Sequence, residues 1–197
     1  MSESVGDKLR RNTRATLLAW VWGQGLNFVR MMVLIYFLDT EGYGLWVFAF
    51  SIITYFFFYN VGLNDALVKY TAECTALRDY ERLSGLLSTG MAVGLIMGGG
   101  VLALLAGFTD EAVAFFNVSS ENLDAARFVV LGVGVASALT LAFGVYSAAL
   151  IGLQRLDINN ACRVGTMTLD FILTVGALSL GYGIRALVTV YTLGIVV

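Results

Sequence analysis

Residues 126–152 read ARFVVLGVGVASALTLAFGVYSAALIG, a run whose one charged residue, Arg127, stands at its edge. A helix needs about 20 apolar residues to cross a hydrocarbon core about 30 Å thick, and this run is long enough to do so. Of the 197 residues in the chain, 58% are hydrophobic and only 13% are charged. Soluble domains carry about 25% charged residues. The composition therefore indicates a polytopic membrane protein.

Six apolar runs of this kind follow one another along the chain. They cover residues 15–38, 43–66, 83–108, 126–152, 161–180 and 183–197. The predicted fold class is all-α, a bundle of six transmembrane helices that forms one domain over residues 15–197, after a polar cytoplasmic segment at residues 1–14. The last run reaches only about 22 Å at 1.5 Å per residue. We therefore expect a sixth helix truncated within a longer protein, with a re-entrant helix as the alternative.

The basic residues indicate the orientation of the chain in the membrane. With the N-terminus in the cytoplasm, nine of the twelve Lys and Arg residues lie on the cytoplasmic side, namely Lys8, Arg10, Arg11, Arg14, Lys69, Arg78, Arg82, Arg155 and Arg163. This distribution follows the positive-inside rule. We expect a multi-pass protein of the cytoplasmic membrane, and the formal net charge of −2 gives no reason to expect a nucleic-acid partner.

The residues that build metal and catalytic centres are scarce. There is no His, and Cys74 and Cys162 are the two cysteines. Neither a metal-ligand set nor a disulfide framework is expected from them, and we expect no cofactor. A membrane-embedded transferase needs clustered carboxylates or His near a membrane face. We therefore expect a protein that is not an enzyme, and keep the transferase as a distant alternative.

Small residues recur at intervals of four in two of the predicted spans. They are Gly90, Gly94 and Gly98 in one, and Gly132, Ala136, Thr140, Gly144, Ala148 and Gly152 in the other. Such faces let helix backbones approach closely in a bilayer. We predict ordinary bundle packing along them, with sliding during a transport cycle as the alternative. Residues 109–123 are predicted to form a short amphipathic element on the outer membrane surface.

Charges inside a span are costly and mark functional sites by default. Arg30 lies about 12 Å deep in the first predicted helix, and Asp170 lies midway along the fifth. We predict an ion pair between them, either as a structural contact or as a gated charge site. Asp65 is predicted to be an interfacial residue near Lys69, one helical turn further on.

Uncharged polar residues extend this region. Gln24 and Asn27 share an arc of the first predicted helix, and Asn60 and Asn64 are one turn apart on the second. Thr166 and Thr174 flank Asp170 at i−4 and i+4. These residues predict a polar strip facing a cavity, with hydrogen bonds between helices as the alternative. A wet, partly cationic cavity would suit an anionic headgroup such as a sugar phosphate.

Two segments resemble a known family. Residues 38–46, LDTEGYGLW, contain the Gly-Tyr-Gly turn typical of polysaccharide exporters, and residues 60–73, NVGLNDALVKYTAE, are similar to a segment of oligosaccharide flippases of the MATE-like superfamily. Asn60 stands where the family usually has Asp, and no proline precedes the turn. Within the second segment, Lys69 and Glu73 are predicted to pair at i+4.

The resemblance implies an N-terminal six-helix lobe of a transporter with twelve to fourteen helices. Such a protein would turn lipid-linked oligosaccharides across the membrane by alternating access, with the lipid bilayer and a coupling cation as its other partners. A drug/cation antiporter remains an alternative within the transporter class.

Overall fold

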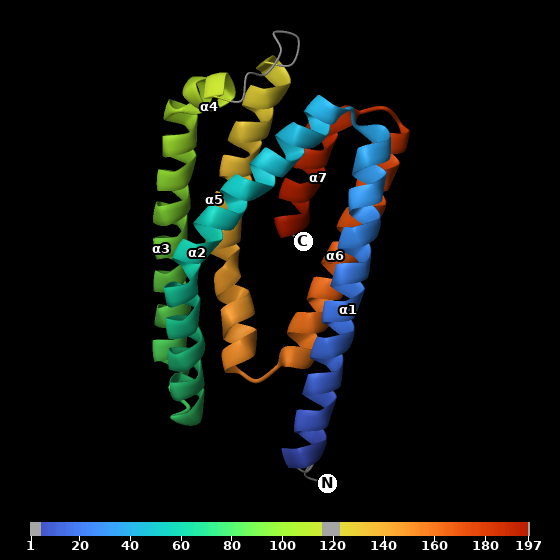
Figure 1. Ribbon diagram of the computed structural model, residues 1–197. Coiled ribbons are helices and arrows are strands. Elements are labelled where there is room, and N and C mark those ends of the chain that lie inside the picture. The colour runs from blue at the N-terminus through green and yellow to red at the C-terminus, as the bar shows by residue number, and fades with distance from the viewer. Residues whose placement is uncertain (1–4, 116–122, 197) are drawn as a thin grey trace.

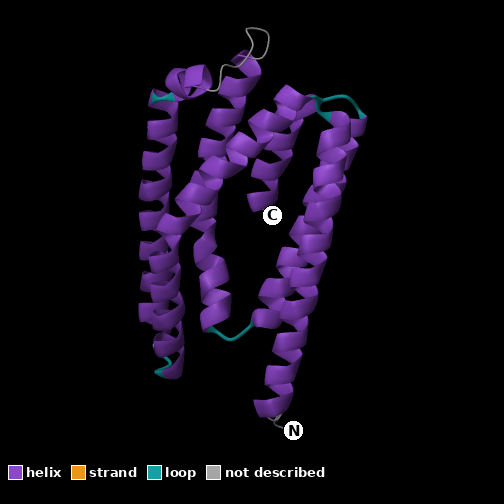
Figure 2. Cartoon of the chain, in the orientation of Figure 1, coloured by secondary structure: helices purple, strands orange, loops and turns teal. Residues whose placement is uncertain are grey.

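The computed structural model describes residues 5–115 and 123–196, and helices account for nearly all of them (Figure 2). In chain order the helices are α1 (Val5–Phe37), α2 (Thr40–Ala76), α3 (Tyr80–Gly107), α4 (Thr109–Phe115), α5 (Leu123–Gly152), α6 (Leu156–Ser179) and α7 (Gly183–Val196). The part of the chain described here contains no strand. The predicted all-α membrane bundle is therefore confirmed.

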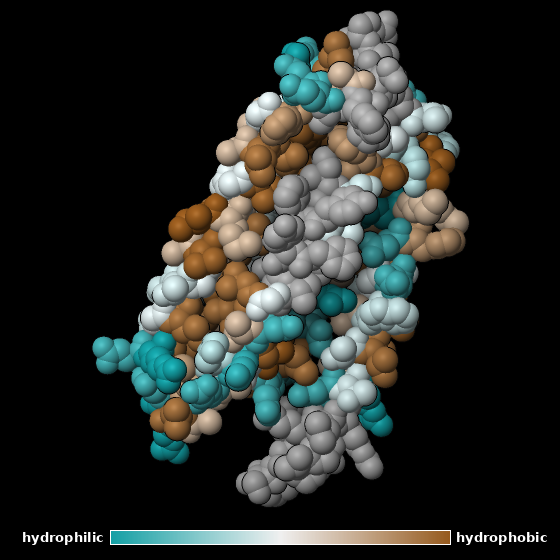
Figure 3. Space-filling view, turned by 60° about the vertical axis from the view of Figure 1, so that its left-hand side comes forward, coloured by the Kyte–Doolittle hydropathy of each residue, from teal (hydrophilic) through white to brown (hydrophobic). Residues whose placement is uncertain are grey.

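The predicted spans correspond to α1, α2, α3, α5, α6 and α7. Within the described residues, α1, α3, α5 and α6 each contain a stretch long and apolar enough to cross a membrane, and α7 is a shorter apolar helix. Apolar side chains cover much of the flank of the molecule, and hydrophilic ones gather toward its lower end (Figure 3). Residues 109–115 of the predicted amphipathic element form α4, and the rest of that element lies outside the described residues.

Several predicted connections are shorter in the structure than the sequence indicated. The polar stretch after residue 66 continues α2 to Ala76, and α6 begins at Leu156 rather than near residue 161. The reason is visible at the ends of α2 and α5. Arg78 and Gln154 adopt φ values of 56°, and the backbone amides of residues 78–79 and 154–155 bond back to the last helical carbonyls. This left-handed cap ends a helix within three residues.

The first turn is set by a side-chain cap. Asp39 has an extended backbone, and its carboxylate accepts a hydrogen bond of 2.7 Å from the amide of Gly42. An aspartate at this position satisfies one of the free amides at a helix N-terminus. A Cβ on residue 42 would lie 2.9 Å from that carboxylate oxygen. The Asp-Thr-Glu-Gly sequence therefore reverses the chain between α1 and α2 without needing proline.

The helices form two groups joined by α7. The first contains α2, α3 and α5, and the second is the pair α1 and α6, which lie side by side along most of their length (Figure 1). α7 packs against both α5 and α6, whereas α1 and α2 have little contact. A buried cluster at the junction draws Leu34, Trp46, Val133, Leu178 and Leu187 from five different helices.

The glycine stripe of α3 packs on α5, as predicted for bundle packing. A Cβ on residue 94 would lie 2.4 Å from the carbonyl oxygen of Leu141, and one on residue 98 would lie 2.5 Å from the Cα of Ala138. Both obstacles are backbone atoms, which cannot move aside as a flexible side chain can. Only glycine permits this approach of α3 to α5.

Gly94→Ala should therefore destabilise the protein by about 1–3 kcal/mol, the usual cost of overpacking. Gly99→Ala is the matched control on the same helix, because a Cβ there would meet nothing within 4 Å. Thermal unfolding of the detergent-solubilised variants measures the difference. Equal unfolding temperatures for the two variants would contradict the assigned packing.

Candidate functional site

The predicted ion pair between Arg30 and Asp170 is present in the structure. Arg30 of α1 donates a hydrogen bond from its Nη2 atom to Oδ2 of Asp170 on α6. The two side chains are only 14% and 12% exposed. The pair joins the two helices of the α1–α6 group near the middle of the bundle.

The pair leaves two polar atoms without partners. Nε of Arg30 and Oδ1 of Asp170 are buried and have no hydrogen-bond partner among the described residues. Gly194 of α7 lies beside Asp170, where a Cβ would be 3.6 Å from that of Asp170. An unsatisfied buried polar atom costs about 1–3 kcal/mol, and more where it belongs to a charged group. The guanidinium and the carboxylate therefore each keep hydrogen-bonding capacity that the contact between them does not use.

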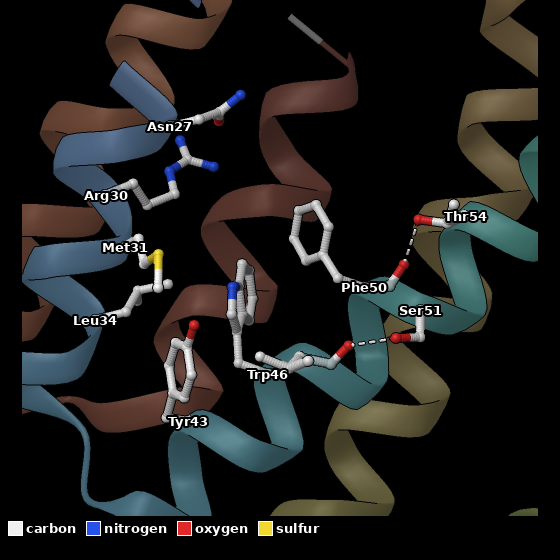
Figure 4. Close-up of a pocket in the computed structure, with 10 residues that line it drawn as sticks. Asn27, Arg30, Met31, Leu34, Tyr43, Trp46, Phe50, Ser51 and Thr54 are labelled. Atoms are coloured by element: carbon white, nitrogen blue, oxygen red, sulfur yellow. Dashed lines mark hydrogen bonds between the residues drawn. The ribbon is translucent and has the colours of Figure 1, made fainter. Parts of the chain in front are cut away.

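A cavity of about 500 Å³ lies between α1 and α2, next to the ion pair. Its lining residues are Asn27, Arg30, Met31, Leu34, Tyr43, Trp46, Val47, Phe50, Ser51 and Thr54. Figure 4 shows the side chains of α1 projecting toward the aromatic side chains of α2. We call this cavity the α1–α2 groove.

Two hydroxyl groups in the lining of the α1–α2 groove are already bonded. The hydroxyls of Ser51 and Thr54 donate to the backbone carbonyls of Val47 and Phe50 (Figure 4). Asn27 and Arg30, one turn apart on α1, add an amide and a guanidinium to the lining, and Tyr43 and Trp46 of α2 add a phenolic hydroxyl and an indole N–H. The groove therefore combines these four polar groups with a mostly apolar wall.

An aromatic cluster stands beside the groove. The ring centroids of Trp46 and Phe50 are 4.9 Å apart, and Tyr191 of α7 lies 5.5 Å from Phe50 and 6.4 Å from Trp46. Sequence reasoning missed these residues. The signal it could have used is the spacing of Tyr43, Trp46 and Phe50 at i, i+3 and i+7, which places them on one helix face.

The structure brings together only part of the predicted polar strip. Arg30 and Asn27 line the α1–α2 groove, and Asp170 is bonded to Arg30. The described lining does not include Gln24, Asn64, Thr166 or Thr174. Thr166 donates to the carbonyl of Arg163, and Thr174 is buried. Asn64 lies about 15 Å further along α2 than Thr54. The side chain of Asn60 lies outside the described residues.

The α1–α6 contact contains polar bonds that the sequence did not predict. Nε1 of Trp22 donates to the hydroxyl of Thr168 at 2.9 Å, and the amide of Asn160 donates to the hydroxyl of Thr16 at 3.0 Å. Together with the ion pair, these bonds tie α1 to α6 at three levels. The alternative of hydrogen bonds between helices was predicted for Gln24, Asn27, Asn60 and Asn64, and it stays a prediction, because the bonds described between α1 and α6 come from other residues.

The predicted pairing at the lower end of α2 is wrong. Among the described residues Glu73 contacts Arg82 of α3, with 3.6 Å between Oε1 and Nη1, whereas the ammonium of Lys69 lies 5.5 Å from the ring centroid of Tyr70. Glu73 pairs with Arg82 rather than with Lys69, because the left-handed turn at residue 78 brings the start of α3 beside the end of α2. Asp65 is exposed, and its position at the membrane interface stays a prediction.

Within the described residues, no three His, Cys, Asp or Glu side chains are grouped so that they could hold a metal ion. Cys74 is buried and Cys162 is exposed, both as free thiols.

Long apolar helices that enclose a charged pair beside a groove indicate a polytopic membrane protein. The chain belongs to the polysaccharide biosynthesis protein family, whose model matches residues 9–197. Members of this family are flippase-type transporters rather than enzymes. No curated protein and no solved structure gives a significant match.

Removing one charge of the Arg30–Asp170 pair should lower the free energy of unfolding more than removing both charges. Arg30→Gln or Asp170→Asn alone leaves an uncompensated buried charge, which typically costs about 3–5 kcal/mol. The double variant should be more stable than either single variant. Chemical unfolding in detergent gives the four free energies of the cycle.

Arg127→Gln is the matched control, because its contact with Asp110 at 2.9 Å is largely exposed. Exposed pairs contribute about 0–1 kcal/mol. If the double variant loses as much unfolding free energy as the two single variants together, the two charges do not depend on each other.

Proposed function

We propose that the protein flips lipid-linked oligosaccharide or polysaccharide precursors across the cytoplasmic membrane by alternating access. The observation that carries the proposal is the position of Arg30, which lines the α1–α2 groove while it holds Asp170. A guanidinium binds phosphate through several N–H donors in a fixed geometry. In the proposal, the phosphate group of the precursor binds Arg30 and the sugars extend along the groove.

Asp170 would act as a counter-ion for Arg30 when no substrate is bound. The anionic substrate then competes with Asp170 for the guanidinium, so the charge is neutralised in both states. Asn27, one turn from Arg30, is placed to donate to the same ligand. Gln24, Asn60, Asn64, Thr166 and Thr174 remain proposed contributors to a wider path that other states of the cycle would open.

The orientation in the proposal places the N-terminus in the cytoplasm. The start of α1, the α2–α3 turn and the α5–α6 turn all lie at one end of the bundle (Figure 1). That end carries most of the basic residues, as the positive-inside rule requires of a cytoplasmic face. The proposal also treats residues 15–197 as one lobe that works with a second one, and includes a coupling cation, both on the family resemblance alone.

The test uses the full-length protein in liposomes with a fluorescent lipid-linked sugar diphosphate. The double variant Arg30→Gln/Asp170→Asn keeps the α1–α6 contact neutral but removes the guanidinium. Because a hydrogen bond to a charged group contributes about 1.5–3 kcal/mol, we expect flipping to fall about tenfold or more. Arg127→Gln is the control and should flip at the wild-type rate.

Unchanged flipping by the double variant would refute the role given to Arg30. If the wild-type protein moves no lipid-linked sugar but exchanges drugs for protons, the antiporter is the correct function.

A further inference from the structure

A second groove lies between α2 and α3, near the turn that joins them. It has a volume of about 450 Å³ and is lined by Tyr70, Cys74, Arg82, Gly85, Leu86 and Thr89. No described residue of α1 or α6 lines it, so it is separate from the α1–α2 groove. We call it the α2–α3 groove.

The α2–α3 groove changes from charged to apolar along its length. Arg82 stands within the first turn of α3, and Thr89 lies about 10 Å further along the helix. Between them a Cβ on residue 85 would meet nothing within 4 Å, so the glycine leaves the space beside Leu86 empty. α3 is long and apolar enough to cross a membrane, and Arg82 lies in its first turn. We therefore expect the mouth at the membrane–water interface and the apolar part at the depth of the acyl chains.

The lining residue Arg82 faces a carboxylate of the neighbouring helix, that of Glu73, which does not itself line the groove. Arg82 of α3 and Glu73 of α2 are 3.6 Å apart and are 55% and 43% exposed. A charge-assisted hydrogen bond is about 2.7–2.9 Å long, so the two groups attract each other without forming one. Each retains most of its capacity to bind a further ligand.

The surrounding charges are balanced. In the sequence, Lys69 and Arg78 stand on either side of Glu73, and the acidic residues Asp79 and Glu81 stand at the start of α3. The Asp79 carboxylate also accepts a hydrogen bond from the amide of Arg82. With as many acids as bases around the mouth, a ligand with a net negative charge gains little. A ligand that carries both signs fits better.

We propose that the α2–α3 groove binds a zwitterionic phospholipid whose headgroup ends in a primary ammonium, such as phosphatidylethanolamine. The lipid phosphate binds Arg82, its ammonium donates hydrogen bonds to Glu73, and one acyl chain lies over Gly85 and Leu86. A primary ammonium has three N–H donors, whereas the trimethylated headgroup of phosphatidylcholine has none. Glu73 therefore distinguishes the two headgroups.

The experiment compares phosphatidylethanolamine, phosphatidylcholine and phosphatidylglycerol with identical acyl chains. Each is added to the full-length protein in detergent, and binding is measured by native mass spectrometry. We expect phosphatidylethanolamine to bind about tenfold more tightly than the other two, the effect of one additional charged contact. Glu73→Gln should remove the preference over phosphatidylcholine.

A second pair of variants tests the acyl-chain site without altering charge. Gly85→Leu should fill the groove and abolish phospholipid binding. Gly99→Leu, on an equally open part of the same helix, should bind phospholipid as the wild type does. Tighter binding of phosphatidylglycerol would overturn the zwitterion assignment. Wild-type binding by Gly85→Leu would overturn the site itself.

Discussion

The close approach of α3 to α5 is the constraint on which the rest of the bundle depends. Lipid tails are as apolar as leucine, so burial of apolar side chains does not drive these helices together. Gly94 and Gly98 instead bring α3 against the backbone of α5. This contact fixes one side of the molecule, and it gives α2 and α7 a rigid surface on which to pack.

The α1–α6 pair is held by a different kind of interaction. Its contacts include three polar links, Arg30–Asp170, Trp22–Thr168 and Asn160–Thr16. Hydrogen bonds between membrane helices contribute modestly, about 0.6 kcal/mol each on average, but each one fixes the rotation of α1 about its axis. The rotation matters because it turns Asn27 and Arg30 toward α2. The weak contact between α1 and α2 then leaves the groove that carries the proposed function.

Hydrophobicity and spacing predicted the spans, the glycine stripe and the Arg30–Asp170 pair, because each follows from chemistry within one helix or from matching depths in the membrane. The lining of the α1–α2 groove could not be predicted in the same way, since it depends on which faces of α1, α2 and α7 meet. Tyr191 joins Trp46 and Phe50 only after α7 has packed between α5 and α6. The end of α2 and the start of α6 were missed because Arg78 and Gln154 make tight turns after α2 and α5 in a conformation usually taken by glycine, which leaves only short connections.

The hydrogen bonding of the Arg30–Asp170 pair bears directly on whether the pair only stabilises the fold or also takes part in the proposed function. A buried ion pair can often be replaced by apolar residues with no loss of stability, so it is weak evidence for a stabilising function. Here the contact also leaves Nε of Arg30 and Oδ1 of Asp170 without described partners. A contact that serves only to join α1 and α6 would be expected to satisfy these atoms. Arg30 lines the groove but its Nε is buried, so in the proposed function an anionic ligand reaches this unsatisfied donor only when the side chain turns away from Asp170 and toward the groove.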